Sequence, residues 1–157
     1  MADICVKDVM AKKVISVEPD MPLIKAAQII MEHSFDGVPV VDEENKLVGI
    51  LTEYDLIEKS SSIHLPTFQK ILENLKVLKQ DSSEFQKEVR EVSALKVRDV
   101  MNNDPLTLEP EASFDEMVKA FREHHRVNPI PVIDKNKKVV GVVSRFDVLK
   151  PLQALNK

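Results

Sequence analysis

Apolar residues along this chain fall into short runs separated by polar turns. Residues 37–41 and 47–51 are two such runs, and the polar residues 42–45 between them predict a hairpin of two strands. Ahead of this hairpin, apolar side chains recur at helical spacing, which predicts a helix over residues 23–33. Residues 12–17 predict a short strand that Pro19 stops. The pattern therefore predicts strand, helix, strand and strand, in that order.

A second helix is expected to begin at Thr52, directly after the last strand. The unit then has the order β-α-β-β-α. Its strands are almost continuously apolar, so each needs an apolar cover on both faces. The helices supply one cover, and the other must come from elsewhere in the chain.

The same unit occurs twice. Four blocks recur in order: VKDVM at 6–10 as VRDVM at 97–101, SVEP at 16–19 as TLEP at 107–110, VPVVD at 38–42 as IPVID at 130–134, and GILTEYD at 49–55 as GVVSRFD at 141–147. The first two pairs are offset by 91 residues and the last two by 92, so one residue has been inserted. This indicates a tandem duplication, and each copy is the expected cover for the other.

The expected fold class is α/β (α+β), with two pseudo-symmetric β-α-β-β-α repeats packed sheet to sheet and a helical insert between them. The expected boundaries are 1–58 for the first repeat, 59–96 for the insert and 97–157 for the second. Apolar residues after Pro66 and after residues 81–83 keep a helical rhythm, which predicts two amphipathic helices in the insert. Their apolar faces either pack on the duplicated core or form a surface for a dimer or a partner.

Composition narrows the function classes. The chain has 157 residues, 43% hydrophobic and 31% charged, with a net charge of −4, which fits a globular protein. Residues 1–56 carry 5 Lys and Arg against 11 Asp and Glu, and residues 97–157 carry 10 against 9. Neither half predicts the basic, aromatic-bearing face of a nucleic-acid binder. No apolar run approaches the roughly 20 residues that span a bilayer, so we expect no membrane partner.

The N-terminal residues lack the apolar stretch of a secretory signal, and Cys5 is the single cysteine, so no internal disulfide can form. We therefore expect a cytoplasmic protein. No P-loop or metal-ligand spacing is present among 3 glycines and 4 histidines. We expect no catalytic residues, no metal site and no required cofactor.

The end of each hairpin carries the candidate chemistry. A strand that runs into a helix leaves free N–H groups and the positive end of the helix dipole at the junction, which suits a phosphate. Thr52 and Ser144 add a hydroxyl there, and Asp55 and Asp147 add a carboxylate one turn later, which can accept both hydrogens of a ribose diol. The alternative is that each pair only caps the start of its helix.

These blocks together resemble the CBS domain family, over residues 7–55 and 98–147. The resemblance implies a Bateman module, in which two repeats pack about a pseudo-twofold axis and leave two clefts that commonly bind adenine nucleotides or S-adenosylmethionine. It assigns phosphate or ribose contacts to Thr52 and Ser144, and ribose contacts to Asp55 and Asp147. It also implies that the base lies near two sets of residues, Ser16 with Ile15, Val38 and Pro39, and Thr107 with Leu106, Ile130 and Pro131. The alternative for the apolar members is an ordinary core role.

The two copies differ beside the hydroxyl. The second has Arg145 where the first has Glu53, and a guanidinium can clamp a phosphate that a carboxylate repels. The cleft that holds Asp147 is therefore expected to take the charged nucleotide, and the cleft that holds Asp55 is expected to be empty or to take a less charged ligand. His125 and Arg126 precede the second hairpin, and Arg126 is a candidate for the opposite cleft; both could instead be a solvated helix end.

The leading hypothesis is a non-catalytic regulatory module that senses AMP, ADP or ATP, or alternatively S-adenosylmethionine. It is expected to form a homodimer and to signal to a regulated protein by shifting the orientation of its repeats. The alternative function is a ligand-free interaction or dimerisation scaffold, in which the motifs are only caps.

Overall fold

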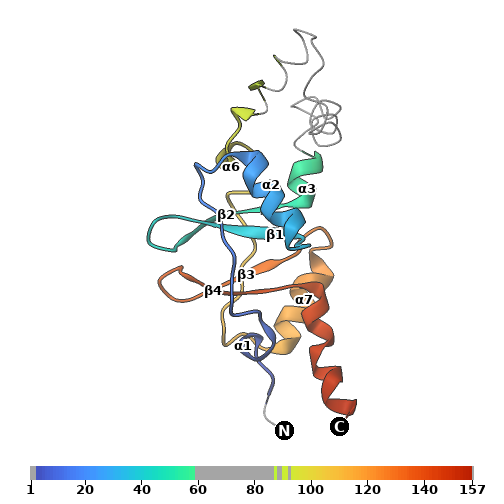
Figure 1. Cartoon of the computed structure of the whole chain (residues 1–157). Helices are drawn as coiled ribbons and strands as arrows, with labels where there is room; N and C mark the ends of the chain where they lie inside the picture. Colours follow the sequence, from blue (N-terminus) through green and yellow to red (C-terminus); the bar gives the residue numbers. More distant parts are fainter. Residues whose placement is uncertain (1–2, 59–86, 88–89, 92, 157) are drawn as a thin grey trace.

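The computed structural model describes residues 3–58, 87, 90–91 and 93–156. Two similar halves are stacked with their hairpins facing each other in the middle and their helices on the outside (Figure 1). The first half contains helix α2 (Leu23–Glu32), strands β1 (Gly37–Val41) and β2 (Leu47–Thr52), and helix α3 (Glu53–Glu58). The second contains helix α7 (Phe114–Glu123), strands β3 (Ile130–Ile133) and β4 (Val139–Val143), and the 3₁₀ helix η2 (Arg145–Asn156). This arrangement confirms the expected fold class.

Each half is built on a two-stranded antiparallel sheet, as the hairpin pattern predicted. β1 pairs with β2 from Gly37 opposite Thr52, and β3 pairs with β4 from Ile130 opposite Val143. Both hairpins shift register at the same place, after Val40 in one and after Val132 in the other. β1 is buried along its whole length, as a strand covered on both faces must be.

The strand predicted over residues 12–17 does not form. Bridges on either side of it join different sheets: Ala11, the residue before the segment, makes an isolated bridge with Val142 on β4, and Val17, its last residue, makes one with Val40 on β1. The segment therefore crosses from one half to the other and runs along neither sheet. The first repeat retains one parallel bridge, between Val17 and Val40. In the second repeat, Leu108 makes the equivalent bridge with Val132.

Two short helices are exchanged between the halves. Helix α1 (Val6–Val9) precedes the first repeat, yet its buried Val6 and Val9 belong to the core of the second half, with Met117 and Ile130. Helix α6 (Val97–Val100) precedes the second repeat and packs in the core of the first. Each core is thus completed by a segment that begins the other repeat, as Figure 1 shows for α1 and α6. The repeat boundaries at residues 58 and 97 stay a prediction.

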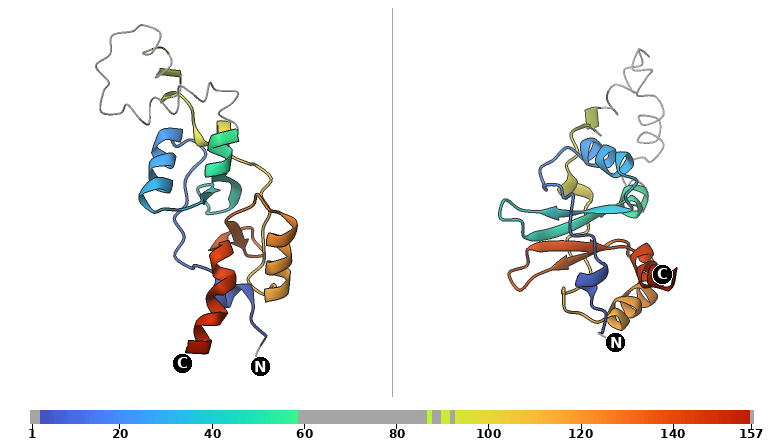
Figure 2. Two further views of the ribbon diagram at one scale, coloured as in Figure 1. Left: turned by 90° about the vertical axis from the view of Figure 1, so that its right-hand side faces the viewer. Right: turned by 60° about the horizontal axis from the view of Figure 1, so that its bottom comes forward.

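Backbone hydrogen bonds join the two hairpins near their turns. Leu47 donates its N–H to the Lys137 carbonyl (2.9 Å), and Val139 donates to the Asn45 carbonyl (3.2 Å). The two turns consequently lie side by side, as the right-hand view of Figure 2 shows. The helices predicted in the insert fall on residues that lie almost entirely outside the described part. Among the described residues, no helix combines the length and apolar character needed to cross a membrane.

Candidate functional site

Two cavities lie where the halves meet, and each is lined by residues from both. The Asp147 cleft has a volume of about 340 Å³. Its described lining comprises Ala11, Lys13, Ile15, Ser34, Phe35, Asp36, Gly37, Pro39, Pro129, Val142, Ser144, Phe146 and Asp147. The Asp55 cleft has a volume of about 180 Å³. Its described lining comprises Ile50, Thr52, Tyr54, Asp55, Asn102, Pro105, Leu106, Arg126, Val127, Asn128 and Pro129.

The two clefts are pseudo-symmetric copies of one another. Each uses the end of one hairpin and the helix start that follows it, together with the corner before the first strand of the other half. In the Asp147 cleft these parts are Ser144, Phe146 and Asp147 with Ser34 to Gly37; in the Asp55 cleft they are Thr52, Tyr54 and Asp55 with Arg126 to Pro129. A ligand in either cleft would contact both repeats.

The Asp55 carboxylate holds the start of α3. Its Oδ2 accepts hydrogen bonds from the Thr52 backbone N–H (3.0 Å) and the Thr52 hydroxyl (2.8 Å), and the Asp55 N–H donates to Thr52 Oγ1 (3.2 Å). Both residues are buried, each 8% exposed. This reciprocal pair is the capping arrangement that the sequence offered as an alternative.

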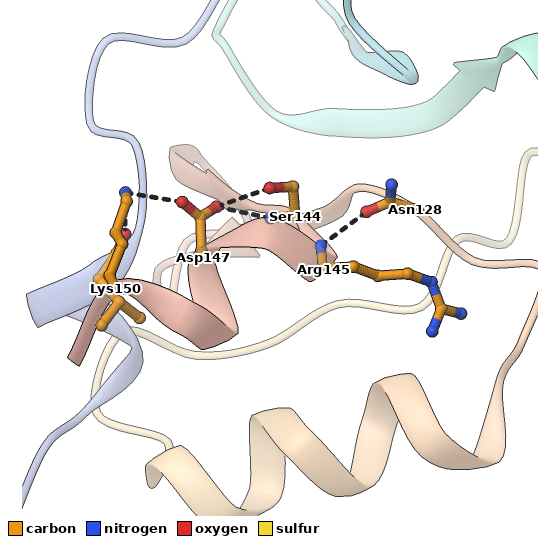
Figure 3. Close-up of polar contacts among 6 residues, drawn as sticks. Asn128, Ser144, Arg145, Asp147 and Lys150 are labelled. Carbon is orange, nitrogen blue, oxygen red and sulfur yellow. Dashed lines mark hydrogen bonds and ion pairs between the residues drawn. The ribbon is translucent and has the colours of Figure 1, made fainter. Parts of the chain in front are cut away.

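Ser144 and Asp147 form the equivalent pair at the start of η2, shown in Figure 3. Asp147 Oδ2 accepts from the Ser144 N–H (2.7 Å) and hydroxyl (3.1 Å). Its other oxygen, Oδ1, forms an ion pair with Lys150 Nζ (2.7 Å), and Lys150 also donates to the Val9 carbonyl. Because a carboxylate has about four lone-pair sites, these bonds leave Asp147 able to accept more.

Arg145 lies beside the Asp147 cleft, but its guanidinium turns away from Ser144 and Asp147 (Figure 3). Nη1 donates to the Phe121 carbonyl (3.2 Å), and Nη2 donates to the carbonyls of His124 (3.0 Å) and His125 (2.6 Å). These carbonyls lie at the C-terminal end of α7, where the last turn leaves acceptors without helical partners. Arg145 is not among the described residues that line either cleft, so its predicted contact with a phosphate stays a prediction.

Among the described lining residues, the cations are Lys13 in the Asp147 cleft and Arg126 in the Asp55 cleft. Arg126 comes from the second repeat and reaches the cleft of the first, where its Nη1 donates to the Tyr54 hydroxyl (2.6 Å). Asp36 adds a negative charge to the Asp147 cleft, and it accepts a hydrogen bond from Asn128 Nδ2 (2.7 Å). Asn128 Oδ1 accepts in turn from the Arg145 backbone N–H (3.0 Å).

The remaining predicted residues divide between the clefts and the cores. Ile15 and Pro39 line the Asp147 cleft, and Leu106 lines the Asp55 cleft. The others are not among the described lining: Val38 and Ile130 are fully buried core residues, Pro131 is buried, Ser16 and Thr107 are half-buried, and His125 is exposed. The predicted set is therefore only partly brought together.

Lys13, Tyr54, Asn102 and Asn128 line the clefts but were missed. The signal that could have found Tyr54 is its place inside the GILTEYD block. Lys13 and Asn102 stand just after the exchanged helices, so their approach to the clefts follows from the exchange.

Burial raises the pKa of the Glu53 carboxyl above its usual value, and the nearby Asp36 and Asp55 carboxylates raise this pKa further. Burial also raises the pKa of the Tyr54 phenol; Glu58 adds to the effect, and Arg126 opposes it. The phenol therefore stays protonated at neutral pH. Within the part of the chain that the structure describes, no group of three or more His, Cys, Asp and Glu could hold a metal ion.

The model of the CBS domain family matches residues 6–62 and again residues 97–154. The chain belongs to the CBS domain family. Its two matched regions make it a tandem CBS pair, the arrangement that the sequence blocks implied. An uncharacterized protein of Methanocaldococcus jannaschii is 26% identical over 153 residues, which cover 94% of this chain and 90% of that protein.

Solved CBS pairs share the fold. A structure of CBSX2 in complex with AMP superposes with a TM-score of 0.71 at 21% identity, and each chain is covered to 98%. The CBS domain pair of protein MJ0100, in complex with 5-methylthioadenosine and S-adenosyl-L-methionine, gives a TM-score of 0.66 at 22% identity, with 99% of each chain covered.

Some relatives are much longer than this CBS pair. This chain is 27% identical over 143 residues to an inosine-5'-monophosphate dehydrogenase from Methanocaldococcus jannaschii, and the match covers only 22% of that protein.

Proposed function

We propose that this CBS pair is a non-catalytic regulatory module that binds an adenosine-containing ligand, AMP, ADP or ATP, in the Asp147 cleft. The observation that carries the proposal is a cavity of about 340 Å³ between the repeats that combines a helix-start aspartate, an apolar wall and a cation. This volume falls within the range of small-molecule pockets, which begins near 300 Å³. The neighbouring CBS pairs bound to AMP and to S-adenosyl-L-methionine support the same ligand class.

Each part of the ligand has a counterpart in this cleft. Three donors already bind the Asp147 carboxylate, which leaves about one lone-pair site for the ribose diol. Ile15, Pro39 and Val142 provide an apolar slot for the base. Lys13 supplies a positive charge for a phosphate. The Ser144 hydroxyl can donate to the phosphate only by turning from Asp147, which then leaves the carboxylate a second site for the diol. S-adenosylmethionine shares the adenosine part but carries no phosphate, which makes it the alternative ligand.

Signalling follows because both repeats line the Asp147 cleft. A ligand that touches both repeats binds best to one relative orientation, so it shifts the population of the pair toward that orientation. A partner protein that recognises one orientation would then respond to the ligand. The helices on the outer surface are the natural place for such recognition.

Titration calorimetry with AMP, ADP, ATP and S-adenosylmethionine tests the proposal. Asp147→Asn should weaken nucleotide binding at least tenfold, while the matched variant Asp55→Asn should retain it. Asparagine is preferred to alanine because its amide oxygen can still accept the bond that starts the helix. Equal loss of binding in the two variants would contradict the assignment to the Asp147 cleft.

The alternative is a ligand-free scaffold, and one observation favours it. In both repeats the hydroxyl and the aspartate already satisfy each other as a helix cap. Thermal unfolding separates the two functions, since a ligand at 100 times its Kd should add about 2.7 kcal/mol to the free energy of unfolding. No stabilisation by any of the four ligands would favour the scaffold.

We also propose that the module is a homodimer. Helices α3 and η2 lie on the same side of the molecule (Figure 2). They expose large apolar side chains, Ile57, Phe146, Leu149, Leu152 and Leu155. A second copy with the same face would cover them. Light scattering should give twice the monomer mass, and Leu149→Glu with Leu152→Glu should give monomers; a monomeric wild type would overturn this assignment.

A further inference from the structure

A contact between the two repeats lies in the lining of the Asp55 cleft. Arg126 of the second half donates from Nη1 to the Tyr54 hydroxyl of α3 (2.6 Å), and its guanidinium carbon lies 5.4 Å from the centre of the Tyr54 ring. This combines a hydrogen bond with a cation–π contact. Both side chains line the cleft, so their pairing occupies space that a ligand would need.

The equivalent cleft has no such pair. The residues 92 positions away from Arg126 and Tyr54 are Ser34 and Phe146, and both line the Asp147 cleft. Serine carries no guanidinium and phenylalanine no hydroxyl, so this contact cannot form there. The cavity is about 340 Å³ in that cleft and about 180 Å³ in the Asp55 cleft. The smaller volume lies below the range usual for small-molecule pockets, so a nucleotide needs the pair to separate.

We infer that the Tyr54 hydroxyl competes with the phosphate of a ligand for the Arg126 guanidinium. The Asp55 cleft therefore opens only to a ligand whose phosphate displaces the phenol from Arg126. The inference rests on the proposed function, because it assumes that nucleotides bind between the repeats. A phosphate is the stronger acceptor, because it brings a negative charge to the guanidinium and can accept two parallel N–H bonds, whereas the neutral phenol accepts one. Adenosine has no group that can replace Tyr54 in this way.

The two clefts should then differ in the order in which they fill and in the ligands that they accept. The Asp147 cleft is open and fills first. The Asp55 cleft fills at higher ligand concentration and only with phosphorylated ligands. Filling it frees Tyr54 on α3, so the second binding event changes the surface of the helix pair formed by α3 and η2.

Calorimetry with AMP and with adenosine tests this order. Wild-type protein should show a tight and a weak AMP site. Asp147→Asn should weaken the tight site and Asp55→Asn the weak one, which assigns each site to its cleft. Tyr54→Phe keeps the ring but removes the competing hydroxyl, so AMP should bind the weak site about threefold to tenfold more tightly. Arg126→Met should abolish that site, and both variants should leave the tight site unchanged. Ser34→Ala is the matched control in the Asp147 cleft and should not alter the weak site.

The Tyr54 ring offers a second measurement, because the chain has one tyrosine and no tryptophan. In protein labelled with ¹³C-tyrosine, the single ring signal should move with AMP as the weak site fills.

An unchanged or weaker second site in Tyr54→Phe, or filling of that site by adenosine, would overturn the inference. AMP binding at the Asp147 cleft alone in every variant would overturn it too, but would leave the proposed function standing. No AMP binding in any variant would overturn both.

Discussion

Asn128 donates a hydrogen bond to Asp36 over 2.7 Å, and these two residues, 92 positions apart, occupy the same place in the two repeats. The corner before β1 and the corner before β3 therefore meet at the pseudo-twofold axis. Asn128 also accepts from the Arg145 backbone N–H, so it links the corner of the first repeat to the start of η2. The two clefts lie on either side of this link.

Asp36→Asn should tighten the binding of AMP. The amide oxygen can still accept from Asn128, but the negative charge that lines the Asp147 cleft is removed. One unit charge near 4 Å in a solvated site corresponds to about 1 kcal/mol, so we expect AMP to bind about fivefold more tightly and adenosine to bind as before. Calorimetry at low salt measures both, and Glu43→Gln at the exposed turn serves as the charge control. An equal gain for adenosine would show that charge is not the cause.

Arg145→Lys should destabilise the protein and leave ligand binding intact. Lysine cannot reproduce the planar fork that reaches the carbonyls of Phe121, His124 and His125. We expect the free energy of unfolding to fall by about 1–2 kcal/mol, measured by urea denaturation, with Arg122→Lys as the surface control. AMP affinity should stay within about twofold. A tenfold loss of AMP affinity without loss of stability would instead support the phosphate contact predicted from sequence.

Gly49→Ala should cost more stability than Gly141→Ala, although the two glycines are equivalent. A Cβ at Gly49 would lie 2.8 Å from the Asn102 carbonyl oxygen, which already accepts from the Ile50 N–H. A Cβ at Gly141 would meet first the flexible side chain of Met10. We expect losses of about 2 and about 1 kcal/mol, within the range for overpacking. Equal losses in denaturation would mean that the Asn102 carbonyl can move aside.

Glu53→Gln should stabilise the protein slightly at neutral pH. Because the pKa of Glu53 is raised by burial and by the Asp36 and Asp55 carboxylates, the native state holds this proton more tightly than the unfolded chain. The ionised side chain therefore costs stability above its folded pKa, and the cost vanishes below its usual value of 4.5. Since Glu53 is an exposed residue whose carboxyl is only partly desolvated, we expect a gain of at most about 0.5 kcal/mol at pH 7 and none near pH 4. In the Asp36→Asn background the gain should be smaller; a gain independent of pH would contradict this origin.

The sequence was sufficient for the features that depend on local pattern. The hairpins followed from apolar runs around polar turns, and helix α2 from residues at helical spacing. The pairs Thr52 with Asp55 and Ser144 with Asp147 were found because their three-residue spacing serves both a helix cap and a ligand.

Features that depend on the other half of the molecule were not predictable in this way. The segment 12–17 has strand-like residues, but the bridges on either side of it join different sheets. The bonds from the Arg145 guanidinium to carbonyls at the end of α7 depend on the packing of that helix, which the local sequence around Arg145 does not show. In the Asp55 cleft, Tyr54 is held by a hydrogen bond from Arg126, which is 72 residues away along the chain.

The exchange of α1 and α6 affects how the molecule can be divided. A fragment that ends before α6 would lack Val97 and Val100 from its core and would carry α1 with no core to join. Cutting the chain between the repeats should therefore yield two halves that fold only when mixed. The same reasoning applies to a single repeat as an independent chain, since two identical copies could complete each other by exchanging their first helices. A domain-swapped dimer of single repeats thus has the geometry from which such a fused pair could have arisen.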